Sequence, residues 1–170
     1  LLHRGFGLLT FAYAAVHVAF LLRFFAKECP RPIWRFLIGP DSLIFSWRDI
    51  RDAFKMVRWF CWLGPRPKLD RWAYFEKFDY FGEIWGIFVI GTTGIILWVP
   101  HLFTRWIPGW VLNCATVVHS FEALLAASVI FLVHFFNTHL RPEKFPIDMT
   151  IITGQISEAE MEEERGAEYE

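Results

Sequence analysis

Three stretches of the chain consist almost entirely of apolar residues, and the polar residues lie between and after them. The stretches cover about residues 5 to 25, 81 to 99 and 110 to 136. Their lengths suit the roughly 20 residues that a helix needs to cross a bilayer. Glu122 is the only charged residue that lies well inside one of these stretches. The pattern predicts an all-α transmembrane helical bundle with three spans in this chain.

A different periodicity marks the long connection between the first two spans. From residue 43 to 63, apolar side chains recur at intervals of three and four residues and charged side chains fill the opposite face, which predicts an amphipathic helix. Its aromatic and basic content suits the membrane interface, and a docking surface for a protein partner is the alternative. The apolar positions are Leu43, Trp47, Ile50, Phe54, Val57 and Cys61.

Composition supports the membrane interpretation and narrows the chemistry. Of the 170 residues, 55% are hydrophobic and 19% are aromatic. Three scattered cysteines form neither Cys-x-x-Cys nor Cys-x-x-Cys-His, so the sequence encodes no zinc knuckle and no covalently attached haem. The chain also lacks a phosphate-binding loop and a Ser-His-Asp pattern, and it offers no nucleic-acid-binding surface.

The distribution of basic residues predicts the orientation of the spans. The connection from 26 to 80 carries eleven Lys or Arg against seven acids, whereas the loop from 100 to 109 has Arg105 alone. By the positive-inside rule, the long connection is expected in the cytoplasm and the short loop on the periplasmic side. Three crossings then place the C-terminal segment in the cytoplasm as well.

The two ends of the chain carry separate expectations. There is no initiator Met, and Leu1 leads almost directly into a span, so we expect further sequence upstream, with an additional N-terminal helix as an open alternative. Residues 1–154 are expected to form the membrane domain. Residues 155–170 form an acidic tail, expected to be a frayed helix or a disordered end.

Four of the six histidines belong to the first and third spans. His3 and His17 are 14 residues apart, or about 21 Å along a helix, and His119 and His134 are 15 apart, or about 22 Å. With three crossings the two helices run in the same direction. The offsets from His3 to His119 and from His17 to His134 are 116 and 117 residues, so the two pairs match in depth.

This matched spacing predicts two haems, each held by one imidazole from either helix. A b-type haem needs a neutral imidazole nitrogen at each axial position of its iron. For a single intramembrane histidine, a hydrogen bond within the helix bundle is an equally good explanation, but four histidines at matched depths favour iron ligation. The predicted ligands are His3 with His119 and His17 with His134.

Four further polar residues are candidates for supporting roles. Arg4 can hold a haem propionate or pair with Glu122, and Glu122 can instead carry a proton or bind a ligand imidazole. Asn137 and His139 follow the second ligand on the third span and are candidates for a quinone or propionate contact. His101 is expected at the membrane interface.

Two other classes of protein compete with this interpretation. A haemless membrane anchor would use the same spans to tether a redox enzyme, but it leaves four buried histidines without a purpose. A small proton or metal transporter would use the histidines and Glu122 as its path. Absorption in the visible region separates both from a cytochrome.

Several local sequences resemble the b-type, di-haem cytochrome subunits of membrane formate dehydrogenases, thiosulfate reductases and hydrogenases. The likeness extends to about Gly154 and is closest to the bacterial branch associated with multihaem c-type cytochromes. It rests on Leu2 to Gly7, Lys77 to Tyr80, Pro108 to Leu112, Val118 to Leu125 and His134 to Pro146.

The resemblance implies the electron-transfer subunit of an oxidoreductase complex in the bacterial inner membrane. Its cofactors would be two haem b groups, its substrate quinone or quinol, and its partners a multihaem cytochrome c or an iron–sulfur protein, in a complex of molybdenum-enzyme or hydrogenase type. It supports His3 with His119 as the periplasmic pair. That family has an earlier helix whose histidine can face the position of His134, so His17 as the local substitute and a ligand from upstream or another chain both stay open.

Overall fold

The computed structural model describes residues 1–142 and 144–170, and that part of the chain is helical without any strand. Three of its helices are long and apolar enough to cross a membrane: α1 (Leu2–Lys27), α4 (Tyr74–Trp98) and the continuous helical segment Trp110–Leu140. The predicted fold class is confirmed in these terms. The three candidate spans indicate a multi-pass membrane protein.

Contacts along the chain define two compact units. The first comprises Leu1–Arg23 and Phe81–Ile147, and the second comprises Phe24–Tyr80 and Asp148–Glu170. The first unit therefore contains most of the three candidate spans. The second contains the long connection, the first turns of α4 and the C-terminal segment.

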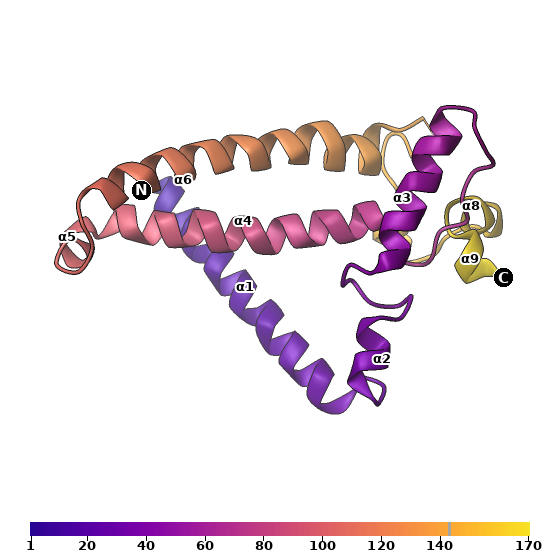
Figure 1. Ribbon diagram of the computed structural model, residues 1–170, viewed down its shortest axis with the longest axis horizontal. Coiled ribbons are helices and arrows are strands. Elements are labelled where there is room, and N and C mark those ends of the chain that lie inside the picture. Colours follow the sequence, from indigo (N-terminus) through magenta and orange to yellow (C-terminus); the bar gives the residue numbers. More distant parts are fainter. Residues whose placement is uncertain (143) are drawn as a thin grey trace. The chain divides into compact units, whose positions relative to one another are not determined.

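In the first unit, α1 crosses α4 and then diverges from it (Figure 1). α4 and α6 (Trp110–Val129) are joined by the short helix α5 (Pro100–Phe103), which has its proline at the first helical position. Phe11 of α1 reaches the backbone of α4 at Gly91, where a Cβ would lie 2.9 Å from the phenyl ring. A side chain at Gly91 would therefore make the Phe11 ring shift at this crossing.

The third span departs from regular α-helix in its second half. α6 continues into two π-helical turns, η1 (Ile130–His134) and η2 (Phe136–Leu140). A π-turn has more residues per turn than an α-helix, and such turns occur often at functional sites. The sequence predicted a uniform helix to residue 136, so both the end of the span and the angular position of His134 differ from that expectation.

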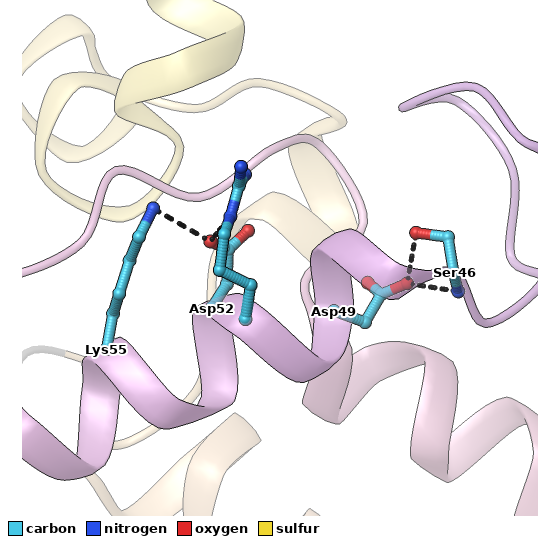
Figure 2. Close-up of polar contacts among 5 residues, drawn as sticks. Ser46, Asp49, Asp52 and Lys55 are labelled. Atoms are coloured by element: carbon cyan, nitrogen blue, oxygen red, sulfur yellow. Dashed lines mark hydrogen bonds and ion pairs between the residues drawn. The ribbon is translucent and has the colours of Figure 1, made fainter.

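The second unit is organised around α3 (Trp47–Phe60), which is shorter than the predicted 43–63. Its first turn carries a capping box, in which Asp49 accepts hydrogen bonds from the backbone N–H and the hydroxyl of Ser46 at 2.7 and 2.8 Å (Figure 2). This cap fixes the start of α3. One turn later, Asp52 accepts from Lys55 at 3.2 Å.

An ion pair connects α3 with the beginning of α4. The Nζ of Lys77 lies 2.8 Å from an Asp49 carboxylate oxygen, and both side chains are almost fully buried. Burial acts to raise the pKa of Asp49, but hydrogen bonds from Lys77 and Ser46 outweigh it, so the pKa lies below its usual value. Asp49 is therefore a buried carboxylate that depends on Lys77 as its counter-ion.

A small apolar core and the C-terminal segment complete the second unit. Met56, Leu69 and Ala73 form the core, with Trp59 and Tyr74 packed against it. The remaining helices of this unit are α2 (Ile33–Leu37), α7 (Thr150–Thr153), α8 (Glu158–Glu164) and α9 (Gly166–Tyr169).

The acidic tail forms the short helices α8 and α9, and a basic segment of the connection, Arg66 to Leu69, lies against it. Arg66 pairs with Glu163, Lys68 pairs with Glu170, and the amide of Ala167 donates to the carbonyl of Leu69 at 3.1 Å. Acidic composition predicted a frayed helix or a disordered end, and the structure has two short helices there. Their contacts join segments about 100 residues apart, which composition does not encode.

Candidate functional site

A cavity of about 560 Å³ lies in the first unit between α1 and α4, with one side chain contributed by α6. This volume falls within the usual range for small-molecule and cofactor pockets, about 300–1,000 Å³. Its walls are mainly apolar, and its ionisable residues are His3, Arg4 and His119.

The two histidines of the cavity lie next to each other although they are 116 residues apart in sequence. The rings of His3 and His119 have centroids 5.9 Å apart and planes nearly perpendicular, at 88°. An atom of metal ligated on opposite sides by two imidazoles, with metal–nitrogen bonds of about 2 Å, separates the centroids by about 6 Å. The observed separation therefore fits axial ligation of one iron by this pair.

Hydrogen bonds to α4 fix the orientation of His119. Its Nδ1 lies 3.1 Å from the carbonyl oxygen of Ile90 and 3.1 Å from the hydroxyl of Thr93. A carbonyl only accepts, so Nδ1 carries the proton and Nε2 keeps its lone pair. This is the arrangement found in metal-binding histidines, whose second nitrogen donates to a backbone carbonyl or a carboxylate.

Gly94 makes room for the His119 ring. A Cβ added at Gly94 would lie 3.1 Å from Cε1 of His119, which is tighter than nine in ten real Cβ contacts. Ile90, Thr93 and Gly94 of α4 together hold the imidazole of α6 in place.

The variant Gly94→Ala is therefore expected to disturb the imidazole without removing it. The new methyl group pushes the ring away from the Ile90 carbonyl and weakens the bond that orients it. For the haem that the sequence predicts at His3 and His119, we expect a changed midpoint potential or a severalfold loss of the cofactor, measured by spectroelectrochemical titration. Gly82→Ala is the matched control, because a Cβ at Gly82 meets no atom within 4 Å, and an equal change in both variants would contradict this role.

Arg4 also lines this cavity, but its partner there is not Glu122, which the sequence had suggested. Its guanidinium lies 5.2 Å from the centroid of the Trp98 ring, a cation–π contact. Within the described part of the chain, Arg4 and Glu122 form no ion pair. Arg4 is thus held at the cavity by an aromatic ring, which leaves its N–H groups available to an anionic group such as a carboxylate.

The remaining candidates lie away from this pair. The ring of His17 stacks on Tyr13 of the same helix, with centroids 6.5 Å apart. His134 ends the π-turn η1, and the ring of His139 in η2 lies 4.9 Å from Phe135. Asn137 donates to the carbonyl of Val133 at 2.9 Å, one turn back in its own helix. Ligation by His17 and His134 stays a prediction.

The donor set of the cavity suits a group that brings most of its own ligands. In the described residues, no group of three or more His, Cys, Asp or Glu side chains is placed to hold a metal ion. The two neighbouring imidazoles could supply two positions, and a porphyrin would supply the other four from its own nitrogens. The residues present at the cavity therefore fit a haem.

Comparison of the chain with protein-family models, with curated proteins and with solved structures gave no match.

Proposed function

We propose that this protein transfers electrons across a membrane through two b-type haems, each ligated by two histidines. The observation that carries the proposal is the His3–His119 pair, whose separation and fixed tautomer suit the two axial positions of one iron. Placing two histidines from different spans together in the hydrocarbon region of a membrane costs free energy, and such residues usually bind a ligand.

Four residues of the cavity have a defined part in this proposal. A bound haem would supply the one-electron exchange between ferric and ferrous iron. His3 and His119 would hold the iron and contribute to its potential, and the Ile90 carbonyl would increase the basicity of His119 by accepting its Nδ1–H. Arg4 is placed to pair with a propionate. The apolar walls lower the local dielectric and exclude water.

The second haem of the proposal uses His134, with His17 as its partner within this chain. Its position follows from the depth relation between the two spans and from the resemblance described above. Asn137 and His139 lie within five residues of His134 in sequence, so a quinone exchanged near this haem would contact them. The electrons would pass to or from a periplasmic redox partner, a multihaem cytochrome c or an iron–sulfur protein, in the bacterial inner membrane.

The test is a pyridine haemochrome spectrum of the full chain purified in detergent, with haem counted per polypeptide. The proposal predicts the α-band of haem b and two haems per chain, both reduced by a soluble quinol analogue. A colourless protein would overturn it and would leave the membrane-anchor and transporter interpretations. If haem is present but quinol does not reduce it, the protein is a cytochrome and quinone is not its substrate.

A further inference from the structure

Helix α3 presents three distinct faces. At about 100° per residue, Trp47, Ile50, Phe54 and Val57 fall in one sector of the helix, and Arg48, Arg51, Lys55 and Arg58 fall in the adjacent sector. Asp49, Asp52 and Met56 occupy the third sector. The apolar stripe is therefore flanked along its length by a row of four cations.

The face that α3 turns toward the rest of its unit is the acidic one. Asp49, Asp52 and Met56 are its buried residues. The apolar stripe points outward, with Trp47 78% exposed, Phe54 69% and Val57 59%. A helix that packs on a water-soluble protein does the opposite and buries its apolar face.

The exposed charges of α3 all have the same sign. Both aspartates are buried and paired, Asp49 with Lys77 and Asp52 with Arg51 and Lys55. The four basic side chains of the helix remain exposed. The accessible surface of α3 therefore combines an apolar stripe with positive charge, which is complementary to an anionic lipid surface.

Contacts within the second unit place this surface next to a candidate span. The buried pair between Asp49 and Lys77 holds the N-terminal turn of α3 against the first turns of α4. α3 runs across the beginning of α4 instead of alongside it (Figure 1). A helix held in this way at the end of a membrane span lies at the level of the lipid headgroups.

We propose that α3 lies in the membrane interface with the stripe of Trp47, Ile50, Phe54 and Val57 in the acyl region, and that Arg48, Arg51, Lys55 and Arg58 bind the headgroups of anionic phospholipids. The capping box and the Lys77 ion pair fix the helix in this rotation. The proposal is independent of haem, because none of these residues lines the haem cavity.

The first test is the depth of spin labels in nanodiscs that contain the full chain. Labels are attached to Phe54→Cys, Val57→Cys and, as the matched control on the same helix, Lys55→Cys. The exposed Cys61 and Cys114 are replaced by serine in each variant. We expect labels 54 and 57 to relax mainly with dissolved oxygen and label 55 mainly with a water-soluble nickel complex. Preferential relaxation of labels 54 and 57 by the nickel complex would overturn the proposal and indicate a protein-docking face.

The second test is lipid selectivity, measured with spin-labelled phosphatidylglycerol against phosphatidylcholine. A basic residue near an anionic surface contributes about fivefold in affinity, so Arg48→Gln with Arg58→Gln should lower the preference for phosphatidylglycerol by about 25-fold. Arg66→Gln with Lys68→Gln removes the same charge from the same connection, but those side chains pair with the tail. An equal loss in both double variants would overturn headgroup binding by α3.

Discussion

The variant His119→Ala is expected to lower the haem content of the purified protein from two per chain to one. In the proposed site, removal of this imidazole would take away one of the two histidine ligands, and it leaves the Ile90 carbonyl and the Thr93 hydroxyl without their hydrogen-bond partner. His3→Ala should have the same effect. The measurement is the pyridine haemochrome count on monodisperse protein whose helical content, from circular dichroism, is unchanged.

Double variants make this result specific to a shared site. If His3 and His119 hold one iron, His3→Ala with His119→Ala still retains one haem, because the second replacement acts on a site already lost. His119→Ala with His134→Ala should retain none. His101→Ala is the control, since His101 lies in α5 outside the cavity. Two haems in His119→Ala, or further loss in the first double variant, would contradict the assignment.

The positions of the three spans could be predicted because hydropathy and length decide them. The ends could not, because they depend on local contacts. The sequence placed the start of the second span at residue 81, whereas α4 begins at Tyr74, where the carboxylate of Glu76 accepts a hydrogen bond from the amide of Ala73 at 2.8 Å. The apolar pattern does not report such a cap.

The candidate site was predictable to the extent that its side chains carry a chemical signal. The matched depth of His3 and His119 predicted that the two side chains lie close together. In the structure their rings are neighbours. The acceptor at Ile90 was not predictable, because it is a backbone carbonyl and any residue has one. Thr93 and Gly94 could have been noticed in the sequence, because a hydroxyl group next to a residue without a side chain, inside a span, indicates a place where a polar side chain of another helix can pack.

Two features could not be predicted from the periodicity of the sequence. The predicted spacing of His119 and His134 assumed a continuous α-helix, and the π-turn at Ile130–His134 changes the direction in which His134 projects from the helix. The pattern of α3 identified its apolar and charged faces correctly, but it could not show which face packs inward. The buried ion pair of Asp49 with Lys77 turns the acidic face inward, and the pattern contains no sign of that pairing.

The variant Lys77→Met is expected to destabilise the second unit by about 3–5 kcal/mol, since it leaves the buried carboxylate of Asp49 without its counter-ion. Methionine keeps most of the lysine stem, so lost packing contributes little. Hydrogen exchange of the α3 amides in detergent measures the local free energy of opening. Lys55→Met is the matched control, because Lys55 also pairs with an aspartate of α3 but is about half exposed, and its loss should cost less than about 1 kcal/mol.

The pH dependence of this difference identifies the ion pair as its cause. The pKa of Asp49 is lowered in the folded protein, so the pair contributes its full stability above about pH 4, the range of an unfolded aspartate, and loses it as the pH falls through the lowered value. In Lys77→Met the buried carboxyl takes up a proton more readily, because burial then acts without the opposing ammonium. The difference between the two proteins should therefore shrink below pH 4. A difference that is constant with pH would assign the effect to packing of the lysine stem.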